Sequence, residues 1–202
     1  MERAAVEQLA HKHRPLVFLH PNEAYLPLDF QTYVDSAQLK VVRPGEAFSA
    51  QALGQWLQET PEINAGDYTL FLPLGRDTPV IAQYHPDDAA LTRVPLYVHH
   101  RFTPPSDDGT VHLMVSYSFM YAYNGPESVL CWDFGAHYAD IEHVTADLAI
   151  RPRGDVTFEQ LYTSRHNGGQ WIPGAELMWN GGERPTVFSS LNGHASYAAP
   201  GN

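Results

Sequence analysis

The sequence predicts a mainly β protein: a single antiparallel β-sandwich with a few short helices, in one domain over residues 1–202. Two observations favour this fold class. Short segments rich in β-branched and aromatic residues recur after residue 67. Turn-forming clusters separate them, at 104–109 (PPSDDG), 151–155 (RPRGD) and 180–185 (NGGERP). Many short strands with few helices are typical of a sandwich, and a chain of 202 residues is long enough to bury its core.

The N-terminal part of the chain supplies the expected helices. Residues 2–12 have the amphipathic spacing of a short helix, and an apolar strand follows at 16–20. Ser49 is a favourable N-cap for a second helix, which runs to about Glu59 because Pro61 then ends it.

Seven strands are expected after this point, at 68–74, 80–84, 95–102, 111–123, 140–148, 158–164 and 186–191. In the fourth of them, period-two alternation gathers the aromatic residues on one face: Tyr117, Phe119, Tyr121 and Tyr123. We interpret this face as part of the core. Tyr121 and Tyr123, near the end of the strand, are the two that we expect beside a ligand.

Composition and charge bear on the class of function and on the cellular compartment. The formal net charge is −11 and the 12 Lys and Arg residues are spread along the chain, so no basic face for a nucleic acid is predicted. No apolar run is long enough to cross a membrane, and the first residues lack a secretory pattern, so we expect a cytoplasmic protein unless a signal has been removed. The single cysteine, Cys131, excludes an intrachain disulfide. An acidic surface is compatible with cation binding. The alternative is that the charge serves solubility alone.

The strongest chemical signal lies in the segment 135–144 (GAHYADIEHV). Asp140 and Glu142 are two residues apart on an expected strand, so both carboxylates leave the same face. His137 follows Gly135, where the chain can turn, and approaches from the end of the strand. Two converging carboxylates repel each other unless a cation or a proton lies between them. The three side chains therefore predict a divalent metal site; the alternative is a surface strand with solvated acids.

Two further histidines lie in glycine-containing segments after expected strands. His166 stands in YTSRHNGGQW (162–171), which ends in Trp171, and His194 stands in NGHASY (192–197). Each alone is typical of a structural histidine, but both are candidates for a metal-site partner or a general acid or base. Trp171 is expected to contact the ligand. The chain has neither a G-x-S-x-G nucleophile elbow nor a Walker-type phosphate loop.

Four segments resemble the family of vacuolar protein sorting-associated protein 62 (Vps62): 16–27 (LVFLHPNEAYLP), 121–126 (YAYNGP), 135–144 (GAHYADIEHV) and 190–197 (SLNGHASY). They occur in this order and span most of the chain. The family name implies a role in vacuolar sorting, which we do not carry over.

A more distant resemblance is to the necrosis-inducing (NPP/NLP-type) cytolysins of plant pathogens. Those proteins are single β-sandwiches in which one His, two Asp and one Glu hold a divalent cation that helps to bind a sphingolipid headgroup. The resemblance places the corresponding set on His137, Asp140 and Glu142, with Asn124 at the first Asp. An amide oxygen ligates a hard cation without contributing charge. Asp133 or Glu127 is expected to compensate for the missing charge, and Asp133 is also expected to contact the ligand.

Three functions fit these residues. The first is a metal-dependent binding module, in which the cation bridges the protein to a sugar, a lipid headgroup or a small oxygenated metabolite. The second is a metal-dependent hydrolase or cyclase, in which the ion is a Lewis acid and His166 or His194 the acid or base. The third is structural, a metal staple or a buried polar network. The binder is favoured because the characterised relatives are binders. Mg or Ca suits the oxygen ligands best, with Zn and Mn as alternatives; the oligomeric state is open.

Overall fold

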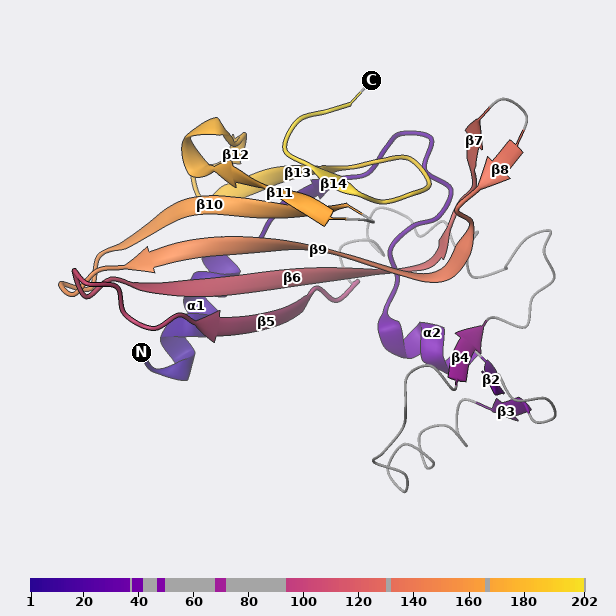
Figure 1. The fold of residues 1–202 in the computed structure, drawn as a ribbon, viewed down its shortest axis with the longest axis horizontal. Helices are drawn as coiled ribbons and strands as arrows, with labels where there is room; N and C mark the ends of the chain where they lie inside the picture. The colour runs from indigo at the N-terminus through magenta and orange to yellow at the C-terminus, as the bar shows by residue number, and fades with distance from the viewer. Residues whose placement is uncertain are drawn as a thin grey trace. The chain divides into compact units, whose positions relative to one another are not determined.

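The computed structural model describes residues 1–36, 38–41, 47–49, 68–71, 94–129, 132–165 and 168–201 (Figure 1). The chain divides into two compact units. The first comprises Met1–Glu23, Leu96–Phe119 and Ile141–Asn202, and the second comprises Ala24–Pro95 and Met120–Asp140. Both units are discontinuous in sequence, and the single domain remains a prediction. Each unit is described by itself below.

The first unit is built on a five-stranded antiparallel sheet in the order β11–β10–β9–β6–β5 (Figure 1). Its strands are β5 (Tyr97–Phe102), β6 (Val111–Asn124), β9 (His137–Ile150), β10 (Val156–Arg165) and β11 (Gly168–Pro173). The last residues of β6 and the first of β9 are counted with the second unit. Four of these strands are predicted by the sequence. β11 is not, because its two adjacent glycines are typical of a loop.

A second sheet of the first unit has four strands and mixed directions. It contains β1 (Leu16–Phe18), β12 (Trp179–Asn180), β13 (Arg184–Ser189) and β14 (Ser196–Tyr197). β1 runs parallel to β13, with Val17 opposite Val187, so the prediction of wholly antiparallel strands is wrong for this pair. A parallel pair cannot be joined by a tight hairpin, and here most of the chain forms the connection.

The buried core of the first unit draws on both sheets and on the helix α1 (Arg3–Lys12), which contributes Val6. The odd-numbered residues of β6 supply Leu113, Val115 and Tyr117, all with no exposed surface, so the interpretation of this face as core is confirmed at these positions; Phe119 is only partly buried against the same cluster. The Tyr117 hydroxyl donates a hydrogen bond of 2.8 Å to the Ala10 carbonyl of α1, and burial raises the pKa of this phenol. One short 3-10 helix, η1 (Gly174–Glu176), follows β11.

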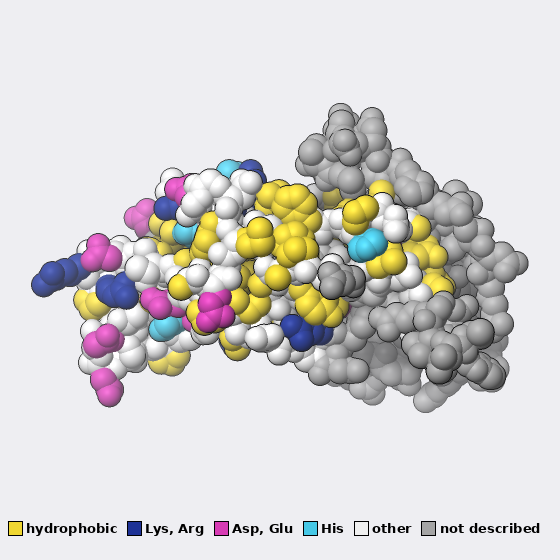
Figure 2. Space-filling model, turned by 90° about the horizontal axis from the view of Figure 1, so that it is seen from above, with side chains coloured by type: hydrophobic (Ala, Val, Ile, Leu, Met, Phe, Trp, Pro, Cys, Tyr) yellow, Lys and Arg dark blue, Asp and Glu magenta, His cyan; other side chains and the backbone are white. Residues whose placement is uncertain are grey.

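Apolar side chains also reach the surface of the described part of the chain, as Figure 2 shows for one face. In the first unit, the rings of Phe18 and Phe188 stack across the parallel pair at 5.5 Å between centroids, and Phe18 is half exposed. None of the helices in the described ranges has the length and apolar character needed to cross a membrane.

The second unit contains one helix and two small sheets among its described residues. Its elements are α2 (Phe30–Ser36), β2 (Gln38–Val41), β3 (Ala47–Ser49), β4 (Tyr68–Phe71), β7 (Glu127–Val129) and β8 (Trp132–Phe134). β3, β2 and β4 form one sheet in that order, and β7 pairs with β8. Ser49 lies in β3 opposite Gln38, so its prediction as a helix N-cap is wrong; strand pairing has overridden a local preference. The rest of that predicted helix and the predicted strand 80–84 lie outside the described residues.

His13 is a buried titratable residue at the end of the first helix. It is the C-cap of α1, and its Nδ1 lies 3.0 Å from the Glu183 carbonyl oxygen, to which it donates when protonated there. Burial is the largest effect on this imidazole and lowers its pKa, outweighing the hydrogen bond to Glu183. A histidine with a lower pKa in the folded protein binds fewer protons when folded, so folding stability rises with pH.

We therefore expect the urea midpoint of unfolding to fall as the pH is lowered from about 6.5, the ordinary histidine value, through the depressed pKa of His13. His13→Gln, which keeps a side-chain N–H donor but does not titrate, should lose part of this dependence. The measurement is urea unfolding at several pH values between 7.5 and 5, followed by circular dichroism. An equal fall in midpoint for both proteins contradicts the assignment to His13.

Candidate metal site and ligand groove

Asn124, at the end of β6 in the second unit, has one side-chain atom without a hydrogen-bond partner among the described residues. The side chain is buried, with 2% of its surface exposed. Its Nδ2 donates to the carbonyl oxygens of Gly125, at 2.9 Å, and Gly135, at 3.0 Å. Two carbonyl acceptors fix which end of the amide is nitrogen. Oδ1 therefore points elsewhere, buried and without a donor.

The two other predicted ligands of the second unit stand at the start of β9. His137 is exposed and is the first residue of the strand, so it does not precede the strand as predicted. Asp140 is buried, with 4% of its surface exposed. Between them, Ala139 has a φ of 61°, in the left-handed region that a residue with a Cβ rarely adopts. A regular strand would place residues three apart on opposite faces, and Ala139 breaks that alternation.

Glu142 belongs to the first unit. Its side chain is 4% exposed, and its Oε2 accepts a hydrogen bond from the Ser164 hydroxyl of β10. The Ser164 oxygen in turn accepts from the His143 backbone N–H at 3.0 Å. Across the described ranges, no three His, Cys, Asp or Glu side chains form a group that could hold a metal ion. The set of His137, Asp140 and Glu142 remains a prediction.

His194 lies in a buried network that joins two of the segments singled out in the sequence. It has no exposed surface, and its Nε2 lies 3.6 Å from Oε1 of Glu23, in the 16–27 segment. Oε2 of the same carboxylate accepts from the Asn192 backbone N–H at 2.7 Å. Both Asn192 and His194 have a positive φ, at 62° and 51°. The loop is thus held in a strained conformation by a buried carboxylate, which favours a structural role for His194.

The remaining predicted residues divide between the two units. Tyr121 is 1% exposed and forms an isolated bridge with Pro27, and Tyr123 packs edge to face with Tyr25 at 5.0 Å between ring centroids. Asp133 lies in β8. His166 lies outside the described residues. Trp171 lies on β11, with 41% of its surface exposed.

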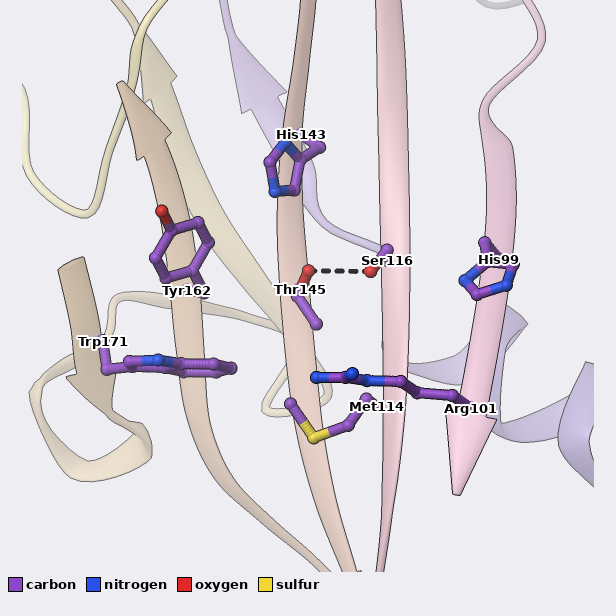
Figure 3. Close-up of a pocket in the computed structure, with 8 residues that line it drawn as sticks. All are labelled: His99, Arg101, Met114, Ser116, His143, Thr145, Tyr162 and Trp171. Carbon is purple, nitrogen blue, oxygen red and sulfur yellow. Dashed lines mark hydrogen bonds between the residues drawn. The ribbon is translucent and has the colours of Figure 1, made fainter. Parts of the chain in front are cut away.

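Trp171 lines a groove of about 470 Å³ on the first unit that the sequence does not predict (Figure 3). Its floor includes Ser116 and Thr145, whose hydroxyl oxygens are 2.8 Å apart, and the ring of Tyr162 lies next to that of Trp171. His143 also faces the groove and stacks on Tyr162 at 5.7 Å; burial lowers its pKa. The signal present in the sequence is that outward-facing positions of several strands carry aromatic and hydroxyl residues.

Comparison with known proteins identifies the family of the chain. A family model described as "Vacuolar protein sorting-associated protein 62" (Vps62) matches residues 2–202, the family that the four sequence segments predict. A search of the curated proteins gives no match. Among solved structures, one similar chain is titled "Crystal structure of non-toxic HaNLP3 protein", with 14% sequence identity and a TM-score of 0.46. The alignment covers 96% of this chain and 68% of that one. No functional property follows from a match at this TM-score.

Proposed function

The chain belongs to the family of vacuolar protein sorting-associated protein 62, and we propose that it is a divalent-cation-dependent protein that binds a small polar ligand. The cation is held in the second unit by Asn124, His137 and Asp140. The observation that carries the proposal is the buried amide oxygen of Asn124, which has no donor among the described residues.

A buried acceptor without a partner is unfavourable by about 1–3 kcal/mol, so such an atom calls for a counterpart. The Nδ2 group of Asn124 is fully engaged by two carbonyl oxygens, so the side chain cannot flip to relieve its oxygen. An amide oxygen is an ordinary ligand of Ca²⁺ and related hard cations. An ordered water is the other species that satisfies such an atom.

Two features of the start of β9 support a cation over water. Asp140 is a buried carboxylate, and carboxylate oxygens are the usual ligands of hard divalent cations. Ala139 adopts a left-handed backbone conformation immediately before it, and strained residues concentrate where a site requires them. Gly135, whose carbonyl fixes the Asn124 amide, is two residues before His137. A carboxylate, an amide oxygen and an imidazole form a mixed set that suits Ca²⁺, Mg²⁺ or Mn²⁺.

The cation supplies open coordination positions for oxygen atoms of a ligand, such as the hydroxyls of a sugar or the oxygens of a lipid headgroup. Binding is favoured over catalysis because the described candidate for a general acid or base is itself buried and engaged by a carboxylate. His194, the described candidate for that role, has no exposed surface and pairs with Glu23.

We also propose that the two sheets of the first unit pack face to face as the predicted sandwich. Residues of both sheets enter one buried cluster, in which Val187 of β13 joins Leu113, Val144 and Leu161 of the five-stranded sheet. Facing sheets with interdigitated inner side chains are the defining feature of that architecture.

Calorimetric titration of the chelator-treated protein with Ca²⁺, Mg²⁺, Mn²⁺ and Zn²⁺ tests the cation site. We expect one equivalent of at least one cation to bind. Asp140→Asn and Asn124→Ala should each weaken it roughly ten- to hundredfold, because each removes a ligand oxygen or its charge. Urea midpoints establish that both variants remain folded.

Asp155→Asn is the matched control, because it removes one negative charge from an exposed turn of the first unit. It should leave cation affinity unchanged. Glu142→Gln in the same assay tells whether the predicted fourth ligand contributes. Absence of stoichiometric binding by the wild-type protein, or wild-type affinity in Asn124→Ala, contradicts the proposal.

A further inference from the structure

The groove of the first unit is a continuous row of side chains across all five strands of the antiparallel sheet. His99 on β5 lies opposite Ser116 on β6, and Thr145 on β9 lies opposite Tyr162 on β10. Tyr162 in turn lies opposite Trp171 on β11. The hydrogen bond between the Ser116 and Thr145 hydroxyls links β6 to β9 at the centre of the row. Cross-strand neighbours on one face form one surface, so this row is a single site, not a set of unrelated side chains.

The charge of the groove is opposite to that of the protein. The chain has 23 Asp and Glu residues and a net charge of −11, yet none of the groove residues is acidic. Arg101 reaches into it from β5, and its guanidinium has no carboxylate partner in the part of the chain that the structure describes. An Arg without a partner on an acidic protein presents a forked donor set that matches a carboxylate or a phosphate. His99, on the same strand, faces the same groove.

The opposite side of the groove is aromatic. Trp171 and Arg101 come from the two edge strands and extend toward each other across the sheet (Figure 3). The rings of Trp171 and Tyr162 are 5.3 Å apart between centroids, at 57° to each other. Trp171 keeps 41% of its surface exposed, so an open ring face is available for stacking.

The rings of Trp171 and Tyr162 together form an aromatic wall, and its packing depends on a glycine in the neighbouring strand. Gly169 of β11 lies directly beneath Tyr162: an added Cβ would lie 2.3 Å from the ring and 2.4 Å from the Thr163 carbonyl oxygen. Only a glycine allows the tyrosine ring to lie this close to the neighbouring strand. The volume of the groove, about 470 Å³, is in the range of small-molecule sites.

We propose that this groove binds an anionic saccharide, with the apolar face of the sugar ring on Trp171 and Tyr162 and the anionic group on Arg101 and His99. A pyranose ring presents C–H groups on one face and hydroxyls at its edge. The Ser116 and Thr145 hydroxyls offer donors and acceptors to that edge. An open groove with one cation and one ring platform fits such a ligand, because it needs partial burial and a few directional contacts.

This inference is independent of the proposed cation site, because every groove residue belongs to the first unit and none is assigned to a cation. Titrations in the presence of a chelator separate the two. Saccharide binding that persists with chelator supports the groove as a saccharide site, whether or not the second unit binds a cation.

The test is calorimetric titration of the whole protein, in chelator, with glucuronate, glucose 6-phosphate, glucose, inorganic phosphate and AMP. We expect glucuronate or glucose 6-phosphate to bind at least about tenfold more tightly than glucose or phosphate alone. The stronger of the two identifies the anionic group. Arg101→Met should remove this advantage and leave glucose unaffected. Trp171→Ala should weaken both sugars about tenfold, and Trp171→Phe, which keeps a flat ring, should retain most of the affinity.

Arg153→Met is the matched control: it makes the same change of charge at an exposed turn of the first unit, away from the groove. It should bind as the wild-type protein does. Both Arg101 and Trp171 are exposed, so their variants should fold, and urea midpoints verify this. The proposal is overturned if neither anionic sugar binds, if AMP binds more tightly than both, or if Arg101→Met keeps wild-type affinity for them.

Discussion

Replacing Glu23 by Ala is expected to lower the free energy of unfolding by about 2–5 kcal/mol, because it removes two contacts made by one buried carboxylate. The Glu23 side chain is 1% exposed, with one oxygen 3.6 Å from the His194 Nε2. The other oxygen accepts from the Asn192 N–H at 2.7 Å. The substitution removes both contacts and leaves a small cavity. It also withdraws the carboxylate that holds two residues with positive φ. Urea unfolding at neutral pH measures the loss.

Two further variants decide whether the effect belongs to this network. Glu7→Ala removes an exposed carboxylate that pairs with Arg3, and it should change stability by less than about 1 kcal/mol. Glu23→Ala combined with His194→Ala should cost clearly less than the sum of the single changes, because the two side chains interact. Additive losses, or a loss in Glu23→Ala no larger than that of Glu7→Ala, would show that the pair does not stabilise the fold.

Gly169→Ala is expected to destabilise the protein by about 1–3 kcal/mol or more, because overpacking forces neighbouring atoms to move. The new Cβ would meet the end of the Tyr162 ring at 2.3 Å, which a side chain can relieve by rotating. It would also meet the Thr163 carbonyl oxygen at 2.4 Å, which only a shift of β10 against β11 relieves. We therefore expect both a lower urea midpoint and a displaced aromatic wall, visible as a change in tryptophan fluorescence.

Gly201→Ala is the natural comparison, since no atom lies within 4 Å of the added Cβ at that position. It should leave both the midpoint and the fluorescence as they are in the wild-type protein. A Gly169→Ala protein with an unchanged midpoint would mean that β11 accommodates the methyl group, and that the close approach of Tyr162 is not required.

Local pattern predicts those parts of the fold whose signal lies within one strand. Alternation along β6 predicts the buried positions Leu113, Val115 and Tyr117, because one face of a strand meets the core whatever its partner. The parallel pairing of β1 with β13 has no such signal, since it depends on two segments that are far apart in sequence. The prediction of Ser49 as a helix N-cap is wrong for a related reason. Ser49 lies opposite Gln38 in a strand pair, and local residue preferences do not reveal such pairing between separate segments.

Much of the candidate site depends on contacts between segments that the local sequence does not show. The burial of Asp140 and Glu142 could not be read from their sequence, which is equally typical of a solvated strand. Glu23, the partner of His194, gives no sign of its role in the local sequence, because its contacts with His194 and Asn192 join residues almost a chain length apart. The groove is missed because outward-facing residues such as Ser116 and Thr145 resemble any solvent-facing surface until the strands are set side by side.

The pairing of the two ends of the sequence has a consequence for synthesis. His13 contacts Glu183, and Glu23 contacts Asn192, at separations of 170 and 169 residues. A ribosome adds about 5–20 residues per second. Roughly ten seconds or more therefore pass between the synthesis of residues 16–23 and the synthesis of their partners. Throughout that interval the edge of β1 and the ring of Phe18 have no partner strand on the nascent chain. The edge of β1 is therefore open to pairing with other strands for longer when translation is slow.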